Sequence, residues 1–185
     1  LRQLPFKDPN RLVMVWEDAS FAGFPRNTPA PANYFDWRSQ QTVFEDMAAL
    51  VGRSFAITGD GEPEKVAAYG VTASFFPLLG VRPWLGRDFT AEECRWGAPR
   101  TAILSYAFWQ RRLGAKADVI GGSITLDGAP TTVVGVLPPS FDFGGTFSPG
   151  RPADLFVPFP LSPENDRKGN MLAVIGRLKP GIDLT

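Results

Sequence analysis

Two pairs of closely spaced carboxylates are the first candidates for chemistry in this sequence. Glu62 and Glu64 flank Pro63 in a turn, and Glu92 and Glu93 are adjacent. Glycoside hydrolysis uses two carboxyl groups that meet in space, which spacing along the chain does not decide. Adjacent residues on a helix point about 100° apart, and no further feature of the sequence supports a catalytic pair. We therefore interpret these glutamates as solvated surface carboxylates.

Histidine is absent, and cysteine occurs once, at Cys94. The lack of imidazole excludes histidine metal sites and Ser-His or Cys-His nucleophiles. Glu92, Glu93 and Arg95 place both signs of charge around the thiol, so the sequence does not indicate a lowered thiol pKa. We interpret Cys94 as an incidental thiol. The sequence thus predicts no catalytic, cofactor-binding or metal-binding residue, and no enzyme.

Other polar motifs have simple structural interpretations. Gly59-Asp60-Gly61, Gly121-Gly122 and Gly144-Gly145 lack the Lys-Ser/Thr of a phosphate-binding loop and the GxGxxG spacing, so we read them as turns. Arg111-Arg112 with Lys116 forms a small basic patch, for which a solvated helix face is favoured over an anionic contact.

An aromatic stretch leaves two interpretations open. Phe141, Phe143 and Phe147 are spread through the Gly/Pro-rich residues 141–153. They form either an exposed docking or lipid-facing loop or ordinary loop packing.

The composition is that of a globular chain. Of 185 residues, 44% are apolar and 21% charged, which suits one domain or two small lobes. Nineteen basic and nineteen acidic residues balance, which argues against a nucleic-acid partner. No apolar run approaches the roughly 20 residues that span a bilayer, and no signal peptide is recognisable. We expect both ends to be cut from something longer.

Residues 66–89 organise the predicted elements. Residues 66–71 read as a strand, residues 73–79 shift to helical spacing, and Gly80 follows as a C-cap. The apolar residues of this helix, Phe75 and Phe76 among them, are expected to be buried where two small cores meet.

Around this stretch the chain alternates strands with few helices. Helices are predicted over 33–50, with Asn33 as N-cap and a break possible at residues 40–42, and over 106–113, capped by Ser105. A loop is predicted over 19–31, and Asp127-Gly128 predicts a hairpin turn. Strands are predicted over 11–17, 55–58, 64–71, 100–105, 123–126, 131–136, 154–159 and 171–178.

The order of these elements predicts an α+β fold with an insertion. Residues 171–178 are expected to share one sheet with the strands near Val13, Ile57 and residues 66–71, because residues 81–160 have strands of their own. The expected division is therefore a discontinuous lobe, 1–80 with 161–185, and an inserted strand-rich lobe, 81–160.

Five segments in order resemble one family. They are residues 31–38 (PANYFDWR), 71–81 (VTASFFPLLGV), 117–121 (ADVIG), 133–136 (VVGV) and 176–181 (GRLKPG). Together they resemble the periplasmic core domain of MacB-type ABC transporter permeases. Trp37-Arg38 and residues 108–112 (FWQRR) are similar to predicted multi-pass permeases of acidobacteria.

The resemblance implies a porter-like β-α-β lobe, whose C-terminal helix is missing here, and an inserted Sabre-like lobe. It implies a position between two transmembrane helices, on the periplasmic face of the bacterial cytoplasmic membrane. The partners implied are the transmembrane helices and ATPase of the same transporter, a periplasmic adaptor and a second permease copy. Transmission of ATP-driven motion is the implied role, without an implied substrate. The alternative is a free-standing periplasmic module that binds a small ligand or peptide.

Two expectations follow for the structure. Without the closing helix, apolar surface near Met171, Val174 or Ile175 should be exposed or covered by a neighbouring molecule. The joint between the lobes should be residues 75–84, with Gly80 as its freest point between Pro77 and Pro83.

Overall fold

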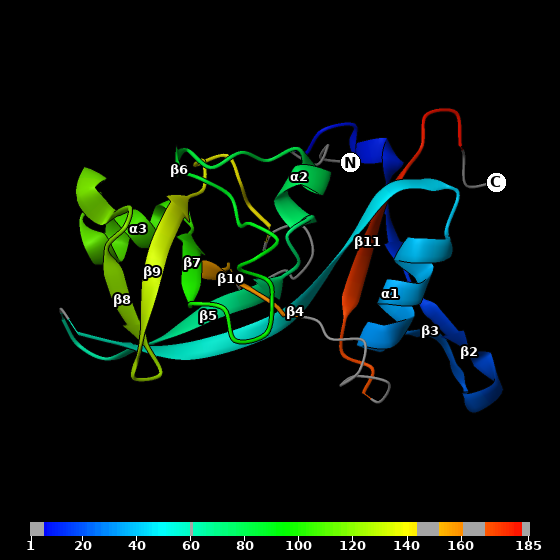
Figure 1. Cartoon of the computed structure of the whole chain (residues 1–185), viewed down its shortest axis with the longest axis horizontal. Helices are drawn as coiled ribbons and strands as arrows, with labels where there is room; N and C mark the ends of the chain where they lie inside the picture. Colours follow the sequence, from blue (N-terminus) through cyan, green and yellow to red (C-terminus); the bar gives the residue numbers. More distant parts are fainter. Residues whose placement is uncertain (1–5, 60, 144–151, 161–168, 183–185) are drawn as a thin grey trace.

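The fold is built on one large mixed sheet. The structure, a computed structural model, describes residues 6–59, 61–143, 152–160 and 169–182 (Figure 1). Nine strands hydrogen-bond into this sheet, and β2 (Glu17–Ala19) pairs separately with β3 (Phe24–Asn27). The order in the sheet is β1 (Leu12–Val15), β11 (Ala173–Leu178), β4 (Phe44–Thr58), β5 (Glu64–Val71), β10 (Leu155–Pro158), β7 (Thr101–Leu104), β9 (Ala129–Val136) and β6 (Leu85–Gly86), and β8 (Ser123–Leu126) pairs with both β4 and β9.

The double pairing of β8 closes part of the sheet into a barrel. The path β4-β5-β10-β7-β9-β8 returns to β4, where Ile57 pairs with Leu126. Alternate side chains of a strand point to opposite faces, so each strand sends apolar residues inward. One cluster contains a buried residue from every barrel strand, namely Ile57, Val66, Leu155, Leu104, Val133 and Leu126.

Helix α3 (Tyr106–Leu113) packs against this barrel core (Figure 1). Its Phe108 and Trp109 are 1% and 7% exposed and belong to the same cluster. As the sequence predicts, Ser105 caps the helix: its side chain accepts a hydrogen bond of 3.2 Å from the Phe108 N–H.

The other end of the sheet is open and covered by two helices. Strand β4 runs from the barrel into this part, where it pairs with β11 (Figure 1). Helix α1 (Pro31–Gln40) contributes Tyr34 to a cluster with Met47 and Ala49. Helix α2 (Phe75–Leu79) packs in a second cluster, which holds the intervening residues Ala48 and Leu50. Strand β4 is therefore buried on both faces here.

The prediction of a helix over 33–50 is wrong beyond Gln40. Residues 44–58 form strand β4 instead, and residues 47–50 are all buried. A strand covered on both faces is an unbroken apolar run, which periodicity alone does not distinguish from a buried helix. The predicted N-cap Asn33 lies inside α1, which begins at Pro31 after Ala30.

The predicted loop over 19–31 contains structure as well. A 3-10 turn, η2 (Ser20–Ala22), joins β2 to β3 in a hairpin, although β3 begins Phe24-Pro25. Proline lacks the N–H of an interior strand but is accepted at an edge. Two further 3-10 turns are η1 (Pro9–Arg11) and η3 (Ala117–Val119).

Of the expected exposed apolar surface near Met171, Val174 or Ile175, only Met171 is exposed. Val174 and Ile175 are fully buried, whereas Met171, which precedes the strand, is 43% exposed. Strand β11 is interior, because it lies between β1 and β4. Its faces are covered as well, since Val174 lies in the cluster with α1 and Ile175 in the cluster with α2.

The α+β class is confirmed, and the strands near Val13, Ile57 and Val174 do share one sheet with β5. The division into a lobe 1–80 with 161–185 and a lobe 81–160 stays a prediction. Hydrogen bonds cross its boundaries, since β5 pairs with β10 and β4 pairs with β8.

Candidate functional site

Helix α2 lies at the junction between the open sheet and the barrel. Phe75, Phe76 and Leu79 are at most 1% exposed, as the sequence predicts. Their cluster also contains Ile103 of β7, Phe156 of β10 and further residues of 81–160. The rings of Phe76 and Phe156 pack edge to face with centroids 5.2 Å apart. One core therefore joins both predicted segments through α2.

Gly80 ends α2 in the left-handed conformation, with φ 71° and its N–H bonded to carbonyls of the helix. A Cβ atom at this position would lie 2.5 Å from the Cβ of Lys7. The expectation that Gly80 is the freest point of the segment is therefore wrong, because close packing with the N-terminal segment holds it. Glycine is needed here for both its φ angle and its size.

Arg177 of β11 ties the same helix to the N-terminal segment. The buried guanidinium donates hydrogen bonds of 2.9 and 2.6 Å to the Leu78 carbonyl, and others to the Lys7 and Asp8 carbonyls. Burial lowers the pKa of Arg177, and the nearby Arg11 adds to the effect. A cation at the C-terminus of a helix also suits the helix dipole.

A cluster of charged residues, Arg87, Asp88 and Glu93, follows α2 in the chain. Arg87 donates hydrogen bonds of 2.8 and 2.9 Å to the two carboxylate oxygens of Glu93, which lowers the pKa of Glu93. Burial raises the pKa of Asp88 to about 6. Burial also raises the pKa of Cys94 to about 11, so this thiol stays protonated at neutral pH. That value agrees with the interpretation of Cys94 as an incidental thiol.

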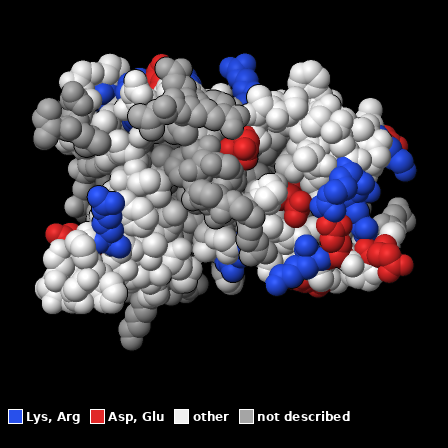
Figure 2. All heavy atoms as spheres, turned by 180° about the vertical axis from the view of Figure 1, so that it is seen from behind, with Lys and Arg blue, Asp and Glu red and all other residues white. Residues whose placement is uncertain are grey.

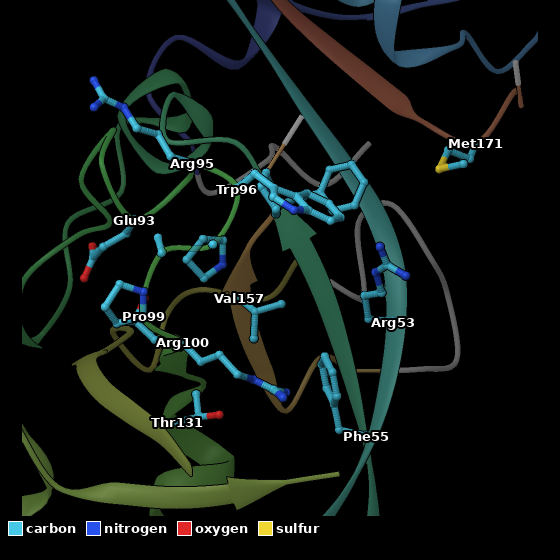
Figure 3. A pocket seen from close by; sticks show the side chains of 16 residues that line it. Arg53, Phe55, Glu93, Arg95, Trp96, Pro99, Arg100, Thr131, Val157 and Met171 are labelled. Atoms are coloured by element: carbon cyan, nitrogen blue, oxygen red, sulfur yellow. The ribbon is translucent and has the colours of Figure 1, made fainter. Parts of the chain in front are cut away.

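A pocket of about 440 Å³ opens at one end of the barrel (Figure 3). Arg53 and Phe55 of β4, Thr131 of β9 and Val157 and Pro158 of β10 line it, together with Glu93, residues 95–101 and residues 159–160. Three of its lining residues, Arg53, Arg95 and Arg100, are exposed arginines. No motif in the sequence pointed to this site. The alternation Arg53, Phe55, Ile57 along β4 was a signal, hidden by the wrong start of that strand.

The polar candidates of the sequence analysis do not assemble into a catalytic site. Glu64 forms an ion pair with Arg111 at 2.5 Å, and Asp154 lies 3.2 Å from the same guanidinium. Arg111 therefore contacts protein carboxylates. Within the residues that the structure describes, no group of three His, Cys, Asp or Glu side chains could hold a metal ion. Gly144-Gly145 lies outside the described residues.

Of the aromatic residues Phe141, Phe143 and Phe147, the first two are described by the structure, and both pack against the core. Phe143 is 2% exposed, and its ring lies 5.3 Å from that of Phe75. Ordinary packing therefore accounts for Phe143, and Phe141 packs against the same cluster. Phe147 lies outside the described residues.

Charge is mixed over the surface. Figure 2 shows Lys and Arg beside Asp and Glu over the barrel end, and no broad area of one sign in that view. Among the described residues, no helix has the length and apolarity needed to cross a membrane.

Three solved structures have a fold similar to that of this chain. The periplasmic region of MacB from Actinobacillus actinomycetemcomitans matches with a TM-score of 0.64 and 12% identity, over 93% of this chain and 75% of that one. A domain of a permease protein from Porphyromonas gingivalis matches with 0.67 and 16%, over 96% and 79%. The extracellular domain of the noncanonical ABC-type transporter YknZ from Gram-positive bacteria matches with 0.60 and 17%, over 92% and 83%. No curated protein sequence matches this chain.

The chain therefore has the same fold as these transporter and permease domains. The family model of the MacB-like periplasmic core domain matches residues 2–185, and the chain belongs to that family. It is a periplasmic domain of a MacB-like ABC transporter permease, and so part of a transporter with transmembrane and ATPase parts.

Proposed function

We propose that this domain transmits the conformational change driven by ATP hydrolysis from the membrane to its periplasmic face. The observation that supports this most directly is the position of α2. Arg177 and the Lys7 N–H donate to carbonyls at the end of α2 and so hold it against both terminal segments, and Phe76 holds its other side in the core shared with the barrel. The first and last described segments, residues 6–11 and 179–182, lie on the α2 side of the molecule (Figure 1).

The stiffness of the packed core around α2 supports this role. In the family, the terminal segments lead to membrane helices, so their movement would reach α2 first. A short helix packed on both sides moves as a unit, and closely packed cores change arrangement in discrete steps. Residues 75–84 are thus the proposed joint, and its movement would be carried to the barrel by the Phe75 and Phe76 rings.

Hydrogen exchange in the full transporter tests this proposal without knowledge of the substrate. Exchange of peptides covering residues 75–89 should differ between the ADP-bound and the vanadate-trapped states. Phe76→Leu should reduce this difference while the ATPase rate stays close to normal, because the ATPase sites lie across the membrane. Where a transported compound is known, export should fall more than ATP hydrolysis.

Phe108→Leu is the matched control for this experiment. Phe108 is as deeply buried as Phe76, at 1% exposure, but lies in the barrel cluster. It should leave the nucleotide-dependent difference in place. An absence of any difference in the unmodified transporter would rule out the relay, and so would an equal effect of both substitutions.

We propose in addition that the β2–β3 hairpin docks a partner protein. Phe21 and Phe24 are 94% and 61% exposed, and the hairpin lies at the edge of the molecule opposite residues 6–11 and 179–182 (Figure 1). Exposed aromatic residues on a projecting hairpin suit a protein partner, for which we propose a periplasmic adaptor. Phe21→Ser with Phe24→Ser should abolish co-purification of that adaptor with the full transporter and leave the ATPase rate unchanged. Unchanged co-purification would place the contact elsewhere.

A further inference from the structure

The pocket at the barrel mouth has the construction of a small-ligand site. Every second residue of a barrel strand faces the interior. On β4, Arg53 and Phe55 therefore lie on the same inward face as the core residue Ile57. Arg100 likewise precedes Ala102 on β7, and Val157 follows Leu155 on β10. Because α3 packs at the barrel core away from these residues, the pocket is the open mouth of the barrel. Barrel mouths are a common position for ligand pockets.

Two cations face the space inside this mouth. Figure 3 shows Arg100 extending across the pocket toward Phe55, with Arg53 on the opposite wall. Among the described residues, neither guanidinium has a carboxylate within 4.0 Å, whereas Arg11, Arg38, Arg87 and Arg111 all form ion pairs. Glu93 and Arg95 point away from the cavity in Figure 3, and Glu93 is held by Arg87. As far as the described residues go, the interior of the mouth is therefore positive.

Much of the remaining wall is apolar and packs against the cations. The Arg53 guanidinium lies 5.1 Å from the centroid of the Phe159 ring, and Phe55 and Val157 add apolar surface. Thr131 of β9, on the inward row of Val133, adds a polar group to this wall.

We propose that the barrel mouth binds an organic anion with an apolar body, such as an aryl or alkyl carboxylate. The cavity of about 440 Å³ lies in the volume range of small-ligand pockets. A carboxylate matches the planar guanidinium groups of Arg53 and Arg100, and the aromatic wall removes the apolar body from water. An inorganic anion would leave that wall uncovered. The inference depends on the pocket and stands apart from the proposed relay.

Two isosteric probes test the charge requirement. 1-Naphthylacetate and the neutral 1-naphthylacetamide are titrated into this chain, followed by calorimetry and by amide chemical shifts. Naphthylacetate should bind at least tenfold more tightly, and the shifts should centre on Phe55, Thr131 and Val157. Equal affinity of the two probes would overturn the proposal. Absence of binding, or shifts centred elsewhere, would do so as well.

Three substitutions assign the binding to the mouth. Arg100→Gln and Arg53→Gln should each weaken naphthylacetate binding about tenfold and leave the weak amide binding unchanged. Arg82→Gln, at an exposed arginine outside the pocket, should change neither. Equal weakening by Arg82→Gln would show an effect of net charge and contradict the site.

Val157→Trp provides a test that does not depend on charge. The larger side chain fills the mouth and should abolish binding of both probes, while circular dichroism confirms the fold. Binding that persists in this folded variant would overturn the location.

Discussion

Asp88 is a partly buried carboxyl group beside the charged pair of Arg87 and Glu93. Its pKa is raised to about 6, first by burial, while the Phe89 N–H, at 2.7 Å, and Arg87 oppose the shift. A raised carboxyl pKa means that the folded state binds more protons than the unfolded chain between about pH 4 and pH 6. The contribution of Asp88 to stability should therefore be greatest below that window and decrease as the pH rises through it.

The variant Asp88→Asn should remove this pH dependence. Asparagine keeps an oxygen for the Phe89 N–H but carries no charge. At pH 7.5 the variant should be more stable by roughly 1 kcal/mol, reduced from the full shift because the group is partly solvated. At pH 4 the difference should vanish. Urea unfolding at both pH values measures it, and a difference that is the same at both would contradict the assigned cause.

Arg177→Met should destabilise the domain by about 2–4 kcal/mol, because buried carbonyls at Leu78 and Lys7 lose a charged donor. Methionine retains most of the apolar stem, so packing is largely kept. The comparison is Arg26→Met, at an exposed position of β3, which should change stability little. Similar losses from both substitutions in urea unfolding would show that the carbonyl contacts are not responsible.

Helices α2 and α3 end in the same way, but the packing around their C-terminal glycines differs. Both end in a left-handed glycine, Gly80 with φ 71° and Gly114 with φ 61°. A Cβ atom at Gly114 meets no atom within 4 Å, whereas one at Gly80 would overlap Lys7. The same local signal therefore marks two different environments.

This pair yields a matched prediction. Gly114→Ala should cost about 1 kcal/mol, the penalty of a left-handed alanine. Gly80→Ala should cost about 2–4 kcal/mol, since the N-terminal segment must also move away. Thermal unfolding of both variants measures the difference. Equal costs would mean that the contact between Gly80 and Lys7 adds nothing to stability.

At the scale of the whole molecule, the shared strand β4 and the shared α2 core connect the barrel to the open sheet. Because so many contacts cross between them, we predict a single cooperative unfolding transition. Fluorotryptophan labelling resolves Trp37 in α1 from Trp109 in α3, and both signals should disappear at the same urea concentration. Two separated transitions would contradict this prediction and favour independent lobes divided at residues 80 and 160.

The sequence by itself determined the elements whose signals are local. Ser105 predicts the start of α3, Gly80 the end of α2, and Asp127-Gly128, with φ 51° and 75°, the hairpin of β8 and β9. These depend on a few neighbouring residues with special hydrogen bonds or φ angles, which are readable along the chain. The resemblance carried by short segments such as residues 71–81 predicted the family, which the family match confirms.

Only the tertiary structure decided how β4 and the barrel form. Residues 47–50 are apolar on both sides because α1 and α2 cover opposite faces of β4, and neither cover is visible in a window of sequence. Barrel closure requires Ile57 to pair with Leu126, and the mouth requires Arg53 of β4 and Arg100, just before β7, to line one cavity. Pairing between distant segments depends on the packing of the whole chain, so the pocket appears in the fold and not in any motif.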